Sequence, residues 1–237
     1  MNLEILPTHT GGAAENMATD FLLLQRYPRA GALRFRHYGW HRPAFTFGYS
    51  QKFSFVQTQL PAGEHFDLCR RATGGGVVDH RDDWTYALVI PRGHPLEELS
   101  AAQSYREIHE ALAAALRAQG VPATTQQVRE PYASEGGPAG VCFQRAEIFD
   151  VVNERTGEKI AGAAQKRNKQ GLLFQGSIWR PATGGSPGWD KFFEEFIAQL
   201  ARALGGSAGR TPWPEFADGE VEALIEQYSS SEWTKHR

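Results

Sequence analysis

The residues best suited to chemistry lie in the stretch Cys69 to His80, which reads C-R-R-A-T-G-G-G-V-V-D-H. Arg70 and Arg71 carry planar cations that match carboxylate or phosphate oxygens. Three successive glycines lack a Cβ, so the backbone can take positive φ values and bring its N–H groups close to a ligand. A plain turn is the usual explanation of an isolated Gly-Gly-Gly, but the full pattern is far more specific than its glycines. The stretch therefore predicts a loop that holds an acidic or carbonyl-bearing ligand.

This stretch, written R-R-x-T-G-G-G-x-V-x-H, resembles the signature of the biotin/lipoate protein ligase superfamily, which comprises lipoate ligases, biotin ligases and octanoyl transferases. Other segments are similar to this superfamily, in the expected order, from about residue 14 to 180. They are N-M-A-T-D at 16–20, P-A-F-T-F-G-Y-S-Q at 43–51, K-I-A-G-A-A-Q at 159–165 and Q-G-S-I at 175–178. The resemblance implies an α+β fold with a mixed, largely antiparallel sheet flanked by helices, as in the lipoate ligase catalytic domain.

One cysteine separates the activities within this superfamily. The segment G-V-C-F at 140–143 resembles the octanoyl transferases, in which the cysteine is the nucleophile. An ATP-dependent ligase forms an acyl-adenylate and needs no such thiol. The resemblance therefore implies that Cys142 takes an octanoyl group from acyl carrier protein. The group then passes to a lysine of an apo lipoyl domain or of the glycine cleavage H protein.

The chemistry of thiols supports the same residue. A thiolate exchanges readily with a thioester, so the acyl group can be held on the protein before an amine takes it. A thiol with a pKa of ~8.5 is only slightly ionised near pH 7, and a neighbouring cation raises the ionised fraction. Lys159 is the candidate cation, and by resemblance its ammonium group also hydrogen-bonds the acyl carbonyl oxygen. The pattern alone is equally consistent with a solvated hairpin lysine.

The resemblance also implies a set of residues that shape the acyl tunnel and its polar mouth. Gly162 lies within a predicted strand, where glycine often marks a close approach by a ligand. His80 could instead cap a turn, and Cys69 ends an apolar run, which favours a buried thiol despite the adjacent arginines. The predicted catalytic residues are Cys142 and Lys159, and the predicted substrate-binding residues are Arg70, Arg71, Thr73, Gly74, Gly75, Gly76, His80, Gly162, Ala163 and Gly176.

Periodicity predicts the elements that must position these residues. Apolar residues spaced three and four apart predict a helix from about Ala14, which places Asn16 and Asp20 on one face. A second helix is predicted from Ser104 to Gln119, with Ser104 and Glu107 as its capping box. Strands are expected at 33–38, 44–47, 77–78 and 85–90, an antiparallel meander at 148–179, and further helices at about 193–200 and 221–228.

Composition limits the remaining possibilities. The 237 residues are 41% hydrophobic, which suits a single catalytic domain over 1–237 with a C-terminal helical extension at 186–237. A net charge of −2 provides no basic surplus for nucleic acid. Two distant cysteines form no disulfide framework, and no apolar run approaches the ~18 residues of a membrane span. We therefore expect a cytoplasmic protein that needs no metal, cofactor, nucleic acid or membrane.

Three alternatives to the octanoyl transferase remain open. An ATP-dependent lipoate ligase would use ATP and Mg²⁺, and many such ligases carry an accessory domain for which few residues remain here. An amidotransferase would move octanoyl from H protein to lipoyl domains, also through a cysteine. A non-catalytic acyl- or lipoate-binding protein is the third. The oligomeric state and the identities of donor and acceptor stay open.

Overall fold

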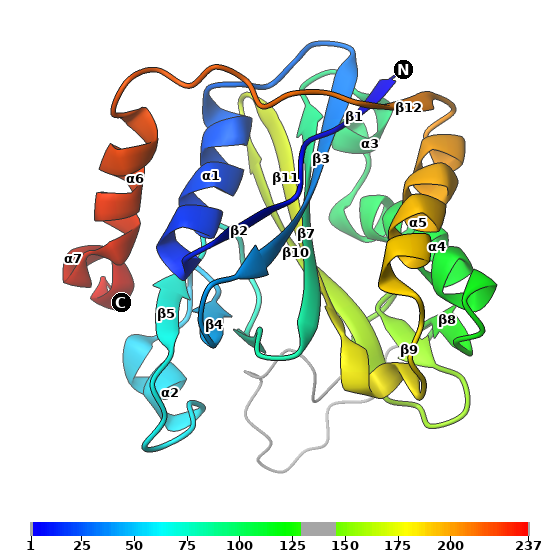
Figure 1. Cartoon of the computed structure of the whole chain (residues 1–237), viewed down its shortest axis with the longest axis horizontal. Coiled ribbons are helices and arrows are strands. Elements are labelled where there is room, and N and C mark those ends of the chain that lie inside the picture. Colours follow the sequence, from blue (N-terminus) through cyan, green and yellow to red (C-terminus); the bar gives the residue numbers. More distant parts are fainter. Residues whose placement is uncertain (1, 129–145, 237) are drawn as a thin grey trace.

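A nine-stranded mixed sheet frames the molecule in the computed structural model, which describes residues 2–128 and 146–236 (Figure 1). Its strand order is β12-β1-β3-β7-β11-β10-β9-β8, and β2 pairs with the end of β3. The pairs that involve β1 or β2 are parallel, whereas those from β3 through β8 are antiparallel. The strands are β1 (Asn2–Ile5), β2 (His9–Gly11), β3 (Ala32–Trp40), β7 (Asp83–Pro91), β8 (Ala123–Thr125), β9 (Val151–Asn153), β10 (Lys159–Asn168), β11 (Gly171–Trp179) and β12 (Ser207–Arg210). The predicted α+β class is confirmed.

A second, three-stranded sheet holds the glycine-rich loop. It has the order β5-β4-β6, with β4 (Ala44–Phe47) between β5 (Asp67–Arg70) and β6 (Val77–Asp79). The loop joins β5 to β6, as the sequence predicts for a connection between strands. The short helix α2 (Phe53–Thr58) packs its buried Val56 into the small apolar cluster of this sheet. The separation into two sheets is not apparent from the sequence.

Helices cover both faces of the large sheet (Figure 1). Helices α1 (Ala13–Gln25) and α6 (Glu220–Ser229) lie on one side, and α4 (Ala101–Ala118) and α5 (Trp189–Ala203) lie on the other. Strand β7 is buried at every position because both of its faces are covered. Alternate residues accordingly enter different clusters: Tyr86 and Leu88 face α5, whereas Ala87 and Val89 face α1. Short helices α3 (Pro95–Glu98) and α7 (Ser231–Lys235) complete the fold, with a 3₁₀ turn at Arg180–Thr183.

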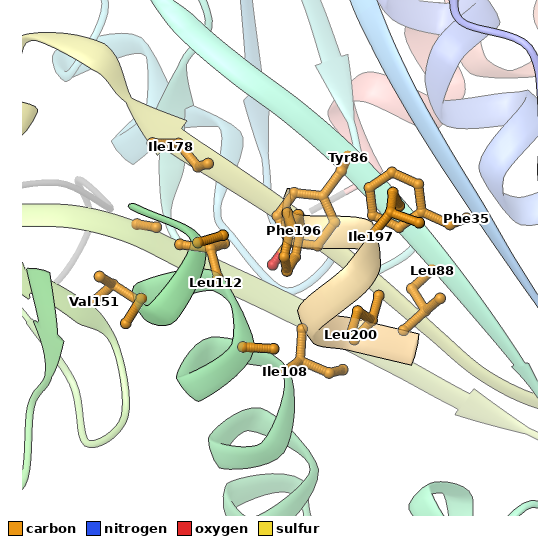
Figure 2. Packing of buried hydrophobic residues seen from close by; sticks show 14 of the residues in the cluster. Phe35, Tyr86, Leu88, Ile108, Leu112, Val151, Ile178, Phe196, Ile197 and Leu200 are labelled. Carbon is orange, nitrogen blue, oxygen red and sulfur yellow. The ribbon is translucent and has the colours of Figure 1, made fainter. Parts of the chain in front are cut away.

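Aromatic rings fix α5 against the sheet (Figure 2). The Tyr86 ring stacks on Phe35 with centroids 5.7 Å apart and meets Phe196 of α5 edge-on at 5.3 Å. Leu112 of α4 belongs to the same buried cluster. Such pairs combine a large buried apolar area with a defined geometry, so they hold β7 as a rigid platform for the polar residues at its start.

The predicted start of one helix changes. Helix α4 begins at Ala101, and its capping box is formed by Ser100 and Gln103, so the predicted box of Ser104 and Glu107 is wrong. The hydroxyl of Ser104 instead donates to backbone carbonyls within the first turn. The pairs Ser100 with Gln103 and Ser104 with Glu107 both satisfy the capping-box pattern. The helix begins at the earlier pair because the residues between them are good helix formers.

The predicted helical extension at 186–237 also contributes to the sheet. Its strand β12 pairs in parallel with β1, and α5 packs on α4. The antiparallel pairing of β9, β10 and β11 matches the meander predicted at 148–179. In residues 2–128 and 146–236, no helix combines the length and apolarity that a bilayer span requires.

Buried histidines predict a loss of stability in mild acid. Burial lowers the pKa of His37 and of His109 below the ordinary value of 6.5. The unfolded chain therefore binds more protons than the folded protein once the pH falls below 6.5, and the free energy of unfolding decreases. Urea titrations should therefore give a lower free energy of unfolding at pH 5.5 than at pH 7.5. His109→Asn should reduce that slope; equal stability at both pH values would contradict the prediction.

Candidate active site

A cavity lies where the two sheets meet α1. Strands of the large sheet supply one wall, and the second sheet with the start of α1 supplies the other. The predicted residues Arg71, His80, Lys159, Gly162, Ala163 and Gly176 line it, together with Met17, Tyr38, Thr46, Val78, Thr85, Ala164, Gln175 and Ser177. The cavity therefore combines an apolar interior with several polar side chains.

Most of the unpredicted lining residues fall within the recognised motifs, whereas Tyr38 and Thr85 lie outside them. Met17 belongs to the first-helix segment, Thr46 to the second segment, and Gln175 and Ser177 to the closing strand segment. Gln175 and Ser177 are two positions apart on β11, so the alternation of a strand places them on the same face. This period of two is the signal that could have identified Ser177 once Gln175 was suspected.

Among the residues that the structure describes, five further predicted ones do not line the cavity: Arg70, Thr73, Gly74, Gly75 and Gly76. Arg70 is fully buried, and its guanidinium donates to backbone carbonyls of Tyr49, Gln51 and Thr234. Its own carbonyl accepts a hydrogen bond from the Trp233 indole, so Arg70 ties α7 to the second sheet. Cys142 lies outside the described residues.

Arg71 and a close backbone contact shape the glycine loop. The Arg71 guanidinium donates to the carbonyls of Gly74 (2.8 Å) and Gly76 (3.0 Å) and to the Thr46 hydroxyl (2.8 Å). Gly75 has φ +88°, which a side chain would disfavour. A Cβ on Gly48 would lie 2.0 Å from the Gly75 carbonyl oxygen. These glycines therefore allow the loop to fold against the end of β4.

A carboxylate orients His80 at the cavity. His80 Nδ1 lies 2.7 Å from Asp83 Oδ2, and its Nε2 lies 2.7 Å from the Thr46 hydroxyl. The Asp83 carboxylate also accepts hydrogen bonds from Thr85 and Ser177. Burial alone would raise the pKa of Asp83, but the charge of His80 and these hydrogen bonds outweigh it and hold the pKa below 3.8. The His80 ring is thereby fixed in one orientation.

A second buried network fixes the Gln175 amide. Its Nε2 donates to Asp20 (2.7 Å), and its Oε1 accepts from the Thr73 hydroxyl (2.7 Å), which assigns the two ends of the amide. Burial raises the pKa of Asp20, and the opposing charge of Arg36 limits that rise. Asn16 accepts from the same guanidinium, which confirms that Asn16 and Asp20 share a helix face.

Lys159, on β10 of the large sheet, forms a buried ion pair at the cavity. Its Nζ lies 2.7 Å from Asp150 Oδ2, and the two side chains are only 7% and 4% exposed. Lys159 starts β10, as predicted, where the register with β9 shifts between Lys159 and Ala161. Such a bulge changes the direction of a side chain and is common beside active sites.

The absence of a side chain at Gly162 leaves room for the Lys159 side chain. A Cβ at Gly162 would lie 2.6 Å from Lys159 Cε and 2.7 Å from Nζ. The lysine side chain therefore crosses the bare backbone of Gly162. The close approach that we expected of a ligand at this glycine is made by Lys159.

The arrangement suits the binding of an acyl group. A lysine cation held in place by a buried carboxylate can donate hydrogen bonds to a carbonyl oxygen on which charge develops. Met17, Val78 and Ala164 provide apolar contacts nearby. Cys69 contributes no reactive thiol, because burial raises its pKa to about 12, which confirms its prediction as a buried residue.

Comparison with known proteins gives consistent matches. The family model of the lipoyl protein ligase A/B catalytic domain matches residues 12–180. The octanoyltransferase LipM of Macrococcus caseolyticus is 34% identical over 208 residues, which cover 82% of this chain and 70% of that protein. The LipM of Oceanobacillus iheyensis is 34% identical over 170 residues, which cover 70% of this chain and 59% of that protein.

Solved structures show the same fold. The putative lipoate protein ligase Ta0514 of T. acidophilum, with bound lipoic acid, has a TM-score of 0.73 at 18% identity, and the match covers 100% of both chains. Lipoate-protein ligase A bound with ATP has a TM-score of 0.71 at 17% identity and covers 99% of both. At such identities these structures establish the fold and leave the reaction to other arguments.

Substitution of Gly162 should displace Lys159 without unfolding the protein. In Gly162→Ala the new methyl group occupies the path of the flexible lysine, which must move away from Asp150. A displacement of about 1 Å lowers turnover roughly a hundredfold. We expect this loss in octanoyl transfer, the activity of the LipM relatives, with a thermal midpoint within a few degrees of wild type.

The control is Gly185→Ala, since a Cβ at Gly185 meets nothing within 4 Å. It should leave transfer unchanged. Full activity in Gly162→Ala would show that the position of Lys159 is not critical.

Proposed function

The chain belongs to the lipoyl protein ligase A/B catalytic-domain family, and we propose that it acts as an octanoyltransferase in lipoate biosynthesis. The donor is octanoyl acyl carrier protein, and the acceptor is a lysine of an apo lipoyl domain or of the glycine cleavage H protein. The observation that carries this proposal is the buried Lys159, which Asp150 holds at the wall of a cavity. Its family relatives at 34% identity are octanoyltransferases.

The reaction proceeds in two acyl transfers. The Cys142 thiolate attacks the carbonyl carbon of the donor thioester, a new carbon–sulfur bond forms, and the carrier thiolate leaves and takes up a proton. The neutral acceptor amine then attacks the same carbon, and the Cys142 sulfur leaves as a thiolate. The nitrogen loses a proton as the amide forms, and this proton passes to the released thiolate. Each tetrahedral intermediate places negative charge on the carbonyl oxygen, which the Lys159 ammonium stabilises.

The cavity supplies the binding site for the acyl chain. Met17, Val78 and Ala164 contact the hydrocarbon and exclude water from it. The fixed Gln175 amide and the His80 ring supply polar groups of defined direction at the same cavity. Neither transfer needs a nucleotide, because the donor arrives as a thioester. We place this reaction in the cytoplasm, where reduced thiols persist.

Substitution of each cysteine in turn should show which thiol carries the acyl group. Cys142→Ala should abolish transfer, whereas Cys69→Ala should retain most of it because the Cys69 thiol is buried with its pKa raised to about 12. Intact-mass spectrometry with octanoyl acyl carrier protein, without acceptor, should detect one thioester-linked octanoyl group in Cys69→Ala and none in Cys142→Ala. An active Cys142→Ala, or equal losses in both variants, would exclude the covalent mechanism.

The energy source distinguishes this proposal from an ATP-dependent ligase. Transfer from octanoyl acyl carrier protein to apo H protein should proceed without ATP or Mg²⁺, because a thioester is exchanged and then converted downhill to an amide. Initial rates should follow ping-pong kinetics. Free octanoate or lipoate with ATP should yield no product. A strict requirement for ATP with release of AMP would show a ligase instead.

A further inference from the structure

A strained residue lies directly before the carboxylate that binds Lys159. Phe149 has φ +68°, and it is the one non-glycine residue with positive φ in residues 2–128 and 146–236. The left-handed conformation is unfavourable for a residue with a Cβ, because the Cβ comes too close to the carbonyl oxygen that follows. Strain of this kind persists only where neighbouring contacts enforce it, and it is concentrated at functional sites.

The backbone N–H and carbonyl of Phe149 both form hydrogen bonds with residues distant in the sequence. Its N–H donates to the Gln126 carbonyl (2.8 Å), and its carbonyl accepts a hydrogen bond from His109 Nδ1 (2.7 Å). His109 lies on α4, and its ring is fully buried against Tyr105 and Phe174, with centroids 5.2 Å and 5.6 Å away. A histidine fixed in the core of the fold thus sets the direction of the Phe149 carbonyl.

The next residue transmits this constraint to the cavity. The Asp150 N–H donates to the Glu147 carbonyl (3.0 Å), and its Oδ2 accepts from the Glu147 N–H (2.8 Å). The same Oδ2 contacts Lys159 Nζ. The peptide between Phe149 and Asp150 therefore determines where the carboxylate lies. If Phe149 relaxed to negative φ, this peptide would rotate and move the carboxylate from Lys159.

We propose that His109 and the left-handed backbone of Phe149 are positioning elements that hold Asp150 against Lys159. Neither residue is among those that line the cavity, so they act through Asp150. A core histidine with only a packing role would contribute through its volume. The positioning role instead depends on the Nδ1 donor and on the sign of one backbone angle. The importance for catalysis rests on the proposed function, whereas the geometry of the ion pair does not.

Paired variants separate the backbone angle from the ring. Phe149→Gly and Phe149→Val both remove the aromatic side chain, but glycine accepts a positive φ and the β-branched valine resists it. We expect acyl-enzyme formation in Phe149→Gly to stay within about threefold of wild type and to fall at least tenfold in Phe149→Val, in kcat more than in KM. Phe149→Ala, which resists positive φ less severely, replaces the valine variant if that protein does not fold.

A second pair tests the donor on α4. In His109→Asn the side-chain N–H can replace Nδ1, whereas His109→Leu fills the space without a donor. We expect His109→Asn to rescue transfer to within a few-fold of wild type and His109→Leu to lose at least tenfold. Thermal unfolding of each full-length variant shows whether a loss of activity exceeds the loss of folded protein.

The deciding measurement does not require octanoyl transfer. Reductive methylation followed by peptide mass spectrometry gives the reactivity of the Lys159 amine, with the exposed Lys191 as the internal reference. We expect at least threefold faster labelling of Lys159 in Phe149→Val and His109→Leu, and wild-type rates in Phe149→Gly and His109→Asn. This pattern in a protein without octanoyl transfer would refute the proposed function alone. Equal labelling within each pair would overturn the positioning role.

Discussion

The ion pair of Lys159 and Asp150 is the interaction on which the site depends. Two buried charges are unfavourable unless they are closely paired and further hydrogen-bonded. Here the backbone N–H of Glu147 supplies an additional hydrogen bond, and the missing Cβ of Gly162 gives the lysine its space. The bulge at the start of β10 and the strained backbone at Phe149 follow from the same requirement. The surrounding fold thus keeps a cation in a largely apolar cavity.

The other polar groups of the large sheet at the cavity follow the same rule that buried polar groups need partners. The Asp83 carboxylate accepts hydrogen bonds from His80, Thr85 and Ser177. The Asp20 carboxylate accepts hydrogen bonds from Tyr38 and Gln175 and pairs with Arg36. Neither carboxylate lines the cavity, but Asp83 fixes the His80 imidazole and Asp20 fixes the Gln175 amide, and both of these groups do. A site with preset polar directions needs little rearrangement to stabilise charge. This explains how a cavity between two sheets can serve acyl transfer.

Local signals in the sequence predicted most of the fold and part of the site. The ordered motifs identify the family, and the predicted antiparallel meander at 148–179 includes Lys159. Nonlocal relations were missed. The pairing of β12 with β1 joins segments near opposite ends of the chain. The hydrogen bond from Arg70 to the Thr234 carbonyl of α7 likewise forms only once both segments have folded. No local pattern marks Asp150 as the partner of Lys159, because a register shift and a left-handed residue bring them together.

A crystal structure of the acyl-enzyme, formed with octanoyl acyl carrier protein in the absence of acceptor, would show whether Lys159 binds the acyl carbonyl. We expect a thioester on Cys142 with its carbonyl oxygen within hydrogen-bonding distance of Lys159 Nζ. The octanoyl chain should lie in the cavity against Met17 and Val78. An acyl group on another residue, or a chain bound outside this cavity with Lys159 still turned to Asp150 alone, would contradict it.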